Sequence, residues 1–367
     1  MFDPSSNTPF VFAGCQRGAE NALKTDLLAQ QPDLRFAFSR PGFLTFKLPA
    51  PTASSTEIAL RSAFLRCTGR TCGKATAENK EDLLSHFTQF LEAQTTRAIH
   101  VWHRQAPSTD TMGYAHQQLD ATVSEIVSAL SNLPTPPTVN TVAQPGTLIA
   151  NCIVVEPLEW WFGTHVVRSV CDRWPGGVYP GTLPESAVSR AYLKLAEALA
   201  WSRMPVRKQD LCVELGSAPG GASQLLLERG LRVVGVDPAE MHPDVMAHPN
   251  FQHRRCRGRD LKRREFRGVR WLVVDSNVAP GHSLDTVEDI VTHRLVSIHG
   301  MLLTLKLLDW NLAEELPELL KRIRGWGYGY VKARQLSHAG QEICVFALRR
   351  RGMLRAPRTA TKRSQRS

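Results

Sequence analysis

Apolar positions in residues 1–172 follow helical spacing in some stretches and strand spacing in others. Helical spacing predicts helices in AENALKTDLLAQ and over residues 57–67, 80–93 and 117–131. Strands are predicted in PFVFAG, in RAIHVWHR and, as a hairpin that turns at Pro41-Gly42, in FAFSRPGFLTFKL. TLIANCIVV and LEWWFGTHVV predict a further strand pair. This part of the chain is therefore expected to be an α+β domain.

From residue 173 onward the pattern changes to a regular alternation of strands and helices. The linker RWPGGVYPGTLPES precedes a helix expected over 185–202, for which Thr182 and Glu185 fit a capping box. Strands are then expected at 210–216, 231–237, 251–256, 269–275, 299–307, 328–334 and 342–349, with helices at 221–229, 284–296 and 311–325. This alternation predicts a doubly wound α/β sheet.

The final two strands are expected to pair in antiparallel orientation. Only RQLSHAG links them, and a link this short cannot hold a helical crossover. We therefore predict three parts: an α+β region at 1–172, an α/β domain at 173–351 and a basic tail at 352–367. The tail has the composition of a disordered segment.

The composition is that of a soluble globular protein, with 43% hydrophobic and 22% charged residues. No apolar run approaches the roughly 18 residues of a membrane span. The first residues, MFDPSSNTPF, lack the basic start and apolar core of a signal peptide. The eight cysteines form no C-x-x-C pair, which disfavours a disulfide framework or a zinc site. We therefore expect a cytoplasmic, monomeric protein with no membrane partner and no metal.

The net charge of +11 is concentrated in two segments. Residues 349–367 hold eight Lys and Arg and no acidic residue, and residues 253–270 hold nine against Asp260 and Glu265. Outside these segments acidic residues slightly outnumber basic ones. Concentrated positive charge favours a polyanionic partner, most simply nucleic acid. The alternative is a solvated basic face beside a frayed tail.

The segment VELGSAPGG joins a predicted strand to a predicted helix. Gly216, Gly220 and Gly221 allow the backbone to approach a ligand closely, and Asp237, at the end of the next strand, can accept hydrogen bonds from a ribose. The spacing matches neither the G-x-G-x-x-G of dinucleotide sites nor a phosphate loop, which needs Gly-Lys-Ser/Thr. A cofactor with a ribose but no phosphate, S-adenosylmethionine, fits best. The alternative is a structural turn that binds nothing.

Two further acidic residues are candidates for contacts with that cofactor. Glu214 precedes the turn and could orient water or the amino group of the methionine part. Asp260 could cap the adenine or its loop, or it could merely balance the surrounding arginines.

Ionisable residues also stand where the predicted strands and helices place them at one edge of the sheet. Asp275 and Lys306 end strands, Glu342 begins the last strand, and Lys194 lies on the helix before the first strand of the sheet. Methyl transfer to a ribose hydroxyl requires a group that removes its proton. A lysine can do so where a second cation and partial desolvation lower its pKa. Each residue alone could equally be a solvated strand end or a loop cap.

These residues lie in SRAYLKL, VELGSAPGG, VVDSNVAP, LLTLKLL and QEICVFALRR, which resemble the motifs of FtsJ-type ribose 2′-O-methyltransferases. The resemblance extends over about residues 185–350. It implies a Rossmann-like S-adenosylmethionine methyltransferase sheet and a Lys-Asp-Lys-Glu tetrad at Lys194, Asp275, Lys306 and Glu342. By the same resemblance Lys306 is the base, and Lys194 and Glu342 position the acceptor and tune Lys306. Asp275 orients the lysines beside the cofactor.

The placement of SRAYLKL after a long N-terminal region, and ARQLSHAGQEICVFALRR, are similar to the RlmM subgroup of that family. Its members methylate a cytidine ribose in large-subunit ribosomal RNA and carry a THUMP-like N-terminal region. The subgroup's cofactor contacts match the following residues of this chain: Ser189, Ala218, Pro219, Gly220, Gly221, Asp237, Asp260 and Asp275.

Other activities fit the residues less well. Methylation of an exocyclic amine needs an Asn/Asp-Pro-Pro-aromatic turn, but the corresponding place reads DSNVAPGH. Methylation at cytosine C5 needs a cysteine nucleophile, whereas Cys212 and Cys344 are predicted inside buried strands. Methylation of a protein or small molecule stays open. A non-catalytic RNA-binding or ribosome-assembly factor that retains the fold is the main alternative from another class.

Overall fold

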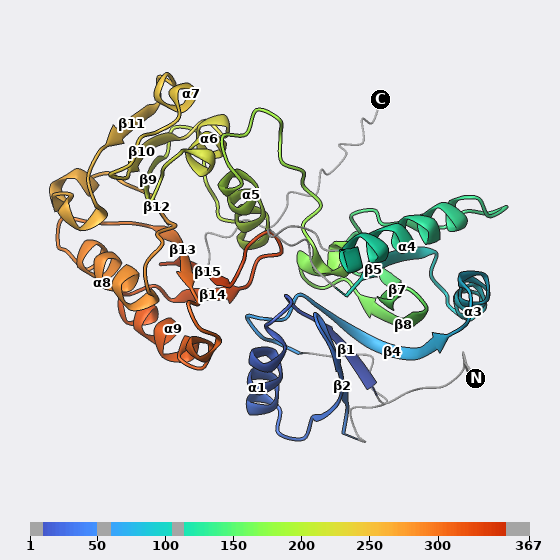
Figure 1. Cartoon of the computed structure of the whole chain (residues 1–367). Helices are drawn as coiled ribbons and strands as arrows, with labels where there is room; N and C mark the ends of the chain where they lie inside the picture. The colour runs from blue at the N-terminus through green and yellow to red at the C-terminus, as the bar shows by residue number, and fades with distance from the viewer. Residues whose placement is uncertain (1–9, 50–59, 105–113, 350–367) are drawn as a thin grey trace, which may run out of the picture. The chain divides into compact units, whose positions relative to one another are not determined.

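The computed structural model describes residues 10–49, 60–104 and 114–349 of the chain, which are drawn as a ribbon in Figure 1. They form two compact units. The first holds the chain up to Leu183 together with Lys306–Leu316 and Ala333–Cys344, and the second holds Pro184–Leu305, Pro317–Lys332 and the chain from Val345. The basic tail at 352–367, expected to be disordered, lies outside the described residues.

The first unit contains an eight-stranded sheet in the order β2-β3-β1-β4-β8-β7-β5-β6. Its strands are β1 (Phe10–Gly14), β2 (Arg35–Arg40), β3 (Phe43–Lys47), β4 (Cys67–Thr76), β5 (Ala98–His103), β6 (Thr138–Val139), β7 (Leu148–Glu156) and β8 (Glu159–Val166). The predicted hairpin at Pro41-Gly42 is confirmed, since β2 and β3 pair antiparallel. The predicted pair of β7 and β8 is likewise antiparallel.

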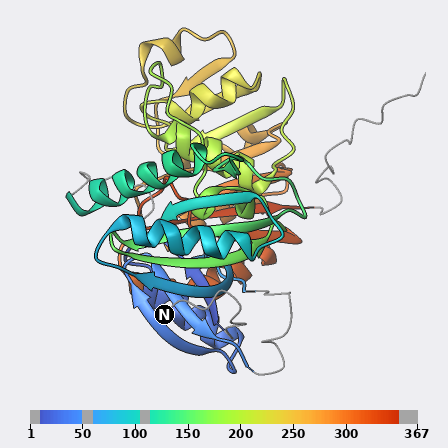
Figure 2. The same cartoon turned by 90° about the vertical axis from the view of Figure 1, so that its right-hand side faces the viewer.

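Among the described residues, the helices α1 (Glu20–Gln30), α3 (Lys80–Glu92) and α4 (Tyr114–Ser131) accompany this sheet. Asn79 begins α3, because its side chain accepts a hydrogen bond from the backbone N–H of Asp82 at 2.9 Å. In Figure 2, α3 and α4 (cyan to green-blue) lie across the same face of the sheet. The unit therefore has the α+β architecture that the sequence predicted for the N-terminal part of the chain.

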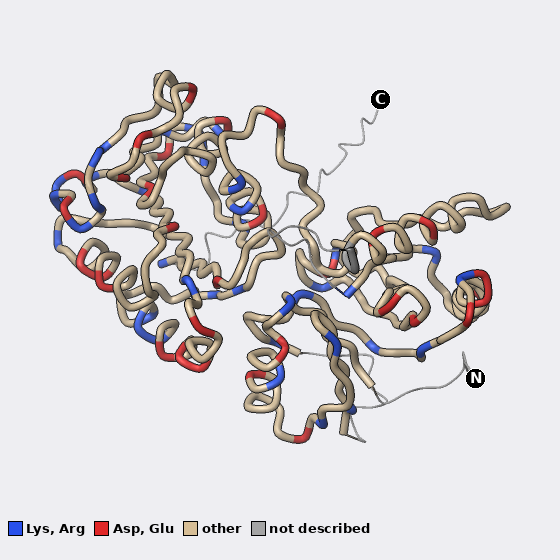
Figure 3. The backbone as a smooth tube through the Cα atoms, viewed as in Figure 1, with Lys and Arg blue, Asp and Glu red and all other residues tan. Residues whose placement is uncertain are grey.

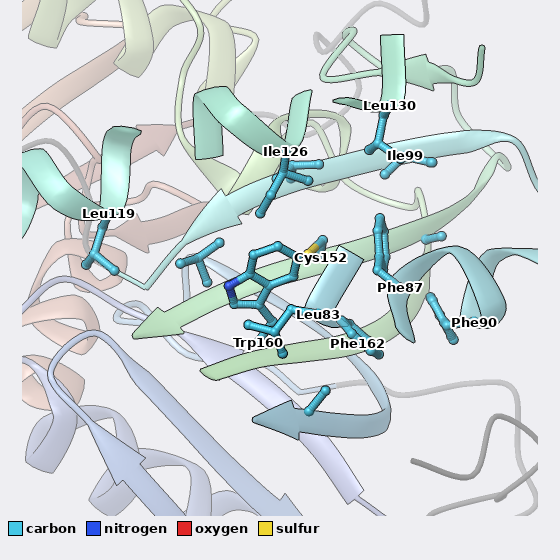
Figure 4. Close-up of a cluster of buried hydrophobic side chains, with 14 residues drawn as sticks. Leu83, Phe87, Phe90, Ile99, Leu119, Ile126, Leu130, Cys152, Trp160 and Phe162 are labelled. Atoms are coloured by element: carbon cyan, nitrogen blue, oxygen red, sulfur yellow. The ribbon is translucent and has the colours of Figure 1, made fainter. Parts of the chain in front are cut away.

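The core of this unit lies between those helices and the sheet. Figure 4 shows Phe87 and Phe90 of α3 pointing toward Trp160 and Phe162 of β8. The ring centroids of Phe87 and Phe162 are 5.2 Å apart, and both side chains are fully buried. Aromatic rings packed at this distance contribute more than their buried area alone. This cluster fixes α3 on the sheet.

The helix expected over 57–67 is wrong for its described residues. Residues 60–66 form a turn and irregular chain, and β4 begins at Cys67 and pairs antiparallel with β1 and β8. Burial alternates along much of CTGRTCGKAT, but its residues are small or polar, so the hydrophobic pattern of the sequence does not reveal this alternation. Gly69 is part of the reason, because a Cβ there would lie 2.5 Å from the Thr164 carbonyl oxygen. Close strand packing, and not hydrophobicity, specifies this strand.

The second unit is built on a seven-stranded sheet in the order β11-β10-β9-β12-β13-β15-β14. The strands are β9 (Leu211–Leu215), β10 (Arg232–Val236), β11 (Phe251–Arg254), β12 (Trp271–Val274), β13 (Gly300–Lys306), β14 (Tyr330–Arg334) and β15 (Glu342–Leu348). From β11 to β13 all neighbours pair in parallel. The terminal residues Lys306 of β13 and Glu342 of β15 are counted with the first unit.

Helices cover both faces of this sheet, as the predicted alternation required. They are α5 (Ala191–Ser202), α6 (Gly221–Glu228), α7 (Pro243–Met246), α8 (Pro280–Val291) and α9 (Leu316–Gly325). Figure 1 shows α5 and α6 on one side of the strands and α8 and α9 on the other. Arg322 of α9 forms salt bridges with Asp285 and Glu288 of α8. The predicted doubly wound α/β fold is confirmed.

Three helix starts of the second unit differ from the predictions, among them that of α9, which was expected at 311 and begins at Leu316. The first helix of the unit begins at Ala191, and Arg190 precedes it without a side-chain cap. The capping box of Thr182 and Glu185 is therefore wrong, because residues 185–190 form a turn and bends that precede the helix. α8 begins at Pro280, earlier than predicted, since proline is favoured in a first turn where its missing N–H has no helical partner.

Among the helices of the described part of the chain, none combines the length and the apolar character that crossing a bilayer demands.

We expect Phe87→Ala to lower the free energy of unfolding by about 3–5 kcal/mol, because it leaves a cavity among aromatic side chains. Phe36→Ala is the matched control. Phe36 is 43% exposed, so the same truncation there should cost much less. Urea denaturation of the full chain measures both. Equal losses for the two variants would show that the cluster does not hold α3 on the sheet.

Candidate active site

The glycine turn between β9 and α6 lies directly against the end of β12. Gly216 has a φ of +80°, and a Cβ there would lie 2.3 Å from the Asp275 carbonyl oxygen. No residue with a side chain fits this position without moving the backbone. The turn therefore lies with its backbone against the carboxyl edge of the sheet, and its contact with a cofactor stays a prediction.

Asp237, directly after β10, holds the turn in place. One carboxylate oxygen accepts a hydrogen bond from the Ala218 N–H at 3.2 Å, and the other accepts one from the Ala239 N–H at 2.8 Å. The side chain is half-buried. Asp237 thus lies at the strand end where the sequence predicted it, against the turn that begins at Gly216.

Ser189 lies against the far end of the same turn. A Cβ on Gly221 would lie 2.3 Å from the Ser189 hydroxyl oxygen, so only glycine leaves room for that hydroxyl. The oxygen is buried and has no hydrogen-bond partner among the described residues. A buried polar group without a partner is costly, and it is commonly satisfied by a ligand or by water. The Gly220 backbone, with a φ of +121°, packs against Val245.

Glu214 is buried within β9 and accepts a 2.5 Å hydrogen bond from the Ser223 hydroxyl of α6. Burial, together with the negative charges of Asp275 and Asp237, raises the pKa of Glu214 to about 8. The contact fixes α6 on β9. The role of Ser223 was not predicted. It could have been inferred from the fact that a carboxyl group inside a strand needs a polar partner. The predicted cofactor contact of Glu214 stays a prediction.

Asp260 lies at the end of a short 3₁₀ helix, Gly258–Asp260, that follows β11. Its side chain is 57% exposed and approaches Arg259 at 3.7 Å. This segment is close to the end of β9, because a Cβ on Gly258 would lie 3.1 Å from a methyl group of Leu215. Asp260 is therefore near the glycine turn, with its carboxylate in solvent.

Lys194 of α5 forms a salt bridge with Asp275, which directly follows β12. Both belong to the second unit, and their side chains are only 17% and 19% exposed. Removing a carboxylate and an ammonium this far from water is favourable only when each has a partner. The pair joins a helix and a strand end that are far apart in sequence.

Lys306, the last residue of β13, forms a salt bridge with Glu342, the first residue of β15. Their side chains are 19% and 8% exposed. The structure therefore arranges the four residues of the predicted tetrad as two lysine–carboxylate pairs. The positions of these residues on strands and helices were predicted from the sequence, but the carboxylate that each lysine binds was not.

The two cysteines considered for C5 methylation lie inside strands of the sheet. Cys212 in β9 and Cys344 in β15 are buried, as predicted. Burial raises the pKa of the Cys212 thiol well above its usual value, so it stays protonated and unreactive. This disfavours a covalent C5-methylation mechanism.

Residues 187–315 match the sequence model of the FtsJ-like methyltransferase family. This region is FtsJ-like. The FtsJ-like region includes Ser189, Lys194, Asp275 and Lys306, and Glu342 follows it along the chain.

Curated relatives extend the likeness beyond that family model. The ribosomal RNA large subunit methyltransferase M of Laribacter hongkongensis is 31% identical over 185 residues, 48% of this chain and 52% of the relative. The same-named protein of Alkalilimnicola ehrlichii is 34% identical over 187 residues, 48% of this chain and 50% of the relative. The chain spans about half the length of the curated relatives it matches. A solved fibrillarin from Aeropyrum pernix is 22% identical, covers 43% of this chain and 76% of its own, and has a TM-score of 0.34.

We expect Glu214→Gln to weaken the pH dependence of stability. Between about pH 4.5 and pH 8 the unfolded chain has released this proton while the folded chain retains it, so wild-type stability falls as pH rises. The fall is on the order of a few kcal/mol and levels off above pH 8. The glutamine variant lacks this proton and should lose much less.

Urea titrations from pH 5 to pH 8.5 without cofactor measure this difference. Glu240→Gln is the control, because the Glu240 side chain is 81% exposed and should leave the slope unchanged. The same slope in wild type and Glu214→Gln would contradict the raised pKa.

Proposed function

We propose that this chain is an S-adenosylmethionine-dependent RNA methyltransferase that acts on a ribose 2′-hydroxyl. The observation that carries this is the two lysine–carboxylate pairs, Lys194 with Asp275 and Lys306 with Glu342. The FtsJ-like match and the relatives named as large-subunit ribosomal RNA methyltransferases support RNA as the substrate. In its most specific form the proposal is methylation of a cytidine in large-subunit ribosomal RNA.

S-adenosylmethionine is the cofactor that fits the turn after β9. Gly216, Gly220 and Gly221 let the turn pack closely on its neighbours, and the Ser189 hydroxyl, which has no partner among the described residues, lies against Gly221. We assign the ribose hydroxyls to Asp237 and the adenine side to Asp260, which extends from the neighbouring segment. When bound, the cofactor supplies an activated methyl group. The residues that would hold it are Ser189, Glu214, Gly216, Ala218, Pro219, Gly220, Gly221, Asp237, Asp260 and Asp275.

In this proposal the tetrad handles the proton of the acceptor hydroxyl. Lys306, in its neutral form, takes up that proton at Nζ as the oxygen becomes the nucleophile. Glu342 holds Lys306 in position and stabilises the ammonium that results. Lys194, held by Asp275, directs a positive charge toward the acceptor oxygen, where negative charge develops.

The strand ends support a shared location for these groups. β12 and β13 are parallel neighbours from Trp271 to Val274 and from Gly300 to Leu303, so the two strands run toward the same edge of the sheet. We propose that β15 runs antiparallel to β13, which would start it at that edge. Two backbone hydrogen bonds support this. The Leu307 N–H donates to the Gln341 carbonyl at 2.9 Å, and the Arg349 N–H donates to the His299 carbonyl at 3.0 Å. They connect opposite ends of the two strands.

The remaining assignments follow from the proposed substrate. Residues 1–172 would form a THUMP-like RNA-binding region, which the α+β architecture of the first unit supports. Residues 173–351 would form the methyltransferase domain, with 352–367 as a basic tail. A protein that modifies ribosomal RNA would act in the cytoplasm, and we expect it to act as a monomer.

The segment between β11 and β12 supports contact with a polyanion. Figure 3 shows Lys and Arg gathered along it. Arg257, Arg264 and Arg267 are exposed, and none forms a salt bridge with a carboxylate of the described residues. Unpaired arginines in solvent are suited to phosphate oxygens. Asp260 lies in the same segment, so this surface borders the proposed cofactor site.

We expect Lys306→Met to reduce methyl transfer at least about 100-fold, because a general base contributes on this scale. Binding of S-adenosylmethionine should stay within about twofold of wild type. Lys208→Met is the control, since Lys208 is exposed and precedes β9, at the opposite edge of the sheet. In contrast, Asp237→Ala should weaken the binding of S-adenosylmethionine.

The assay is transfer of labelled methyl to unmodified large-subunit ribosomal RNA, followed by alkaline hydrolysis. Label in an alkali-resistant dinucleotide identifies a 2′-O-methyl group and its base. Label in mononucleotides would mean base methylation and would contradict the tetrad. Cofactor and RNA binding without turnover in wild type would favour a non-catalytic RNA-binding factor.

We expect the triple variant Arg257→Gln, Arg264→Gln and Arg267→Gln to weaken RNA binding and to flatten its salt dependence. If each arginine meets one phosphate, the log–log slope should fall by about 2. The charge-matched control replaces Arg203, Arg207 and Arg229, which are exposed and precede β9 or β10. Filter binding over a range of salt concentrations measures both variants. Equal slopes for them would exclude this segment as the RNA surface.

A further inference from the structure

The first unit holds the Lys306–Glu342 pair, and the segment that delivers Glu342 is fastened within that unit by a buried arginine. Arg334 ends β14 and is only 8% exposed. Its guanidinium donates to three backbone carbonyls, those of Leu65 at 3.2 Å, Arg66 at 3.1 Å and Gly177 at 3.2 Å. These carbonyls come from the chain before β4 and from the 3₁₀ turn Pro175–Gly177.

The acceptors of Arg334 are themselves packed tightly. A Cβ on Gly177 would lie 2.2 Å from the Arg66 carbonyl oxygen, so the two backbones meet without room for a side chain. A planar guanidinium with several fixed donors matches such a set of carbonyls, whereas a lysine ammonium does not. Arg334 therefore ties the end of β14 to two rigid points of the chain.

Residues 335–341, here called the strap, continue this attachment as far as Glu342. The Gln335 N–H donates to the Ala63 carbonyl at 2.7 Å. The Ser337 hydroxyl accepts from the Tyr179 N–H at 3.1 Å, and the His338 ring bonds the Tyr179 carbonyl at 3.0 Å. Ser337 is 1% exposed, which is unusual for a residue in a link between strands.

The far end of the strap is connected to both members of the ion pair. The Gln341 carbonyl accepts a hydrogen bond from Leu307, the residue after Lys306, at 2.9 Å. The next residue is Glu342, whose carboxylate binds Lys306. The position of this carboxylate therefore depends on a series of hydrogen bonds, from side chains and backbone, that begins at Arg334.

We propose that Arg334 is a positioning residue for methyl transfer, and that it acts through the strap on Glu342 and thereby on Lys306. The role rests on the proposed function of the tetrad. Small displacements of a catalytic group cost much rate, and a shift of about 1 Å can cost about 100-fold. The N-terminal half of the chain thus sets the geometry of the base, in addition to any contact it makes with RNA.

The test compares full-length wild type, Arg334→Gln and Arg104→Gln. Arg104 is the matched control: it is also a buried arginine of the first unit that bonds backbone carbonyls, those of Val155 and Pro41, but it is not attached to the strap. We expect Arg334→Gln to lower kcat at least about tenfold, with KM for RNA and Kd for S-adenosylmethionine within about twofold of wild type. Arg104→Gln should lower the melting temperature and leave kcat near wild type.

A double-mutant cycle separates positioning from general destabilisation. Glu342→Gln should lower kcat, and adding Arg334→Gln to it should cause little further loss, because both changes act on the same carboxylate. Additive losses would overturn the proposal, as would an unchanged kcat in Arg334→Gln. If Arg334→Gln does not fold, Ser337→Ala removes one strap contact and is put through the same cycle.

The activity of the wild-type protein distinguishes failure of the positioning role from failure of the proposed function. If wild type and Arg104→Gln both transfer methyl and Arg334→Gln equals them, only the positioning role fails. If wild type binds cofactor and RNA but transfers no methyl group, the proposed function fails, and the positioning role fails with it.

Discussion

The close contact between the Gly216 backbone and the Asp275 carbonyl oxygen sets the geometry of the carboxyl edge of the second sheet. The Gly216 N–H bonds the Val236 carbonyl at 2.9 Å, and the Asp275 N–H bonds the Leu215 carbonyl at 3.0 Å. The ends of β9, β10 and β12 are thus fastened to one another by backbone alone. Side chains that follow these strands, Asp237 and Asp275, inherit fixed positions from this contact.

Charge at the predicted site residues is balanced within each unit. Lys194 is paired with Asp275 in the second unit and Lys306 with Glu342 in the first, and each pair is mostly shielded from water. Such pairs contribute little net stability, but loss of one partner would leave a charge that the surroundings do not solvate. Glu214 avoids an uncompensated buried charge in another way, because burial favours its protonated form and Ser223 donates a hydrogen bond to it. Charge pairing and protonation together keep these sites polar without an uncompensated buried ion.

Strand ends were predictable from the sequence, whereas side-chain partners were not. The apolar runs before Asp237 and Asp275 specify buried strands, and the parallel order then places these two carboxylates at one edge. Nothing in the local pattern indicates that Lys194 binds Asp275 and not another acid. That choice depends on how α5 packs, and its start at Ala191 was itself predicted too early. β4 was missed because its glycines are required by close packing against neighbouring strands, and these strands are distant in sequence.

The strap also limits how this chain can vary in length. Links between strands are ordinarily the places where insertions and deletions are tolerated, because their backbones face water. Residues 335–341 lack that freedom: one end is fixed by the guanidinium of Arg334 and the other by the bond from Leu307 to Gln341. An added residue would have to bulge into buried surroundings or shift Glu342. The link is therefore restricted to seven residues, because these residues must span the distance between its two fixed ends.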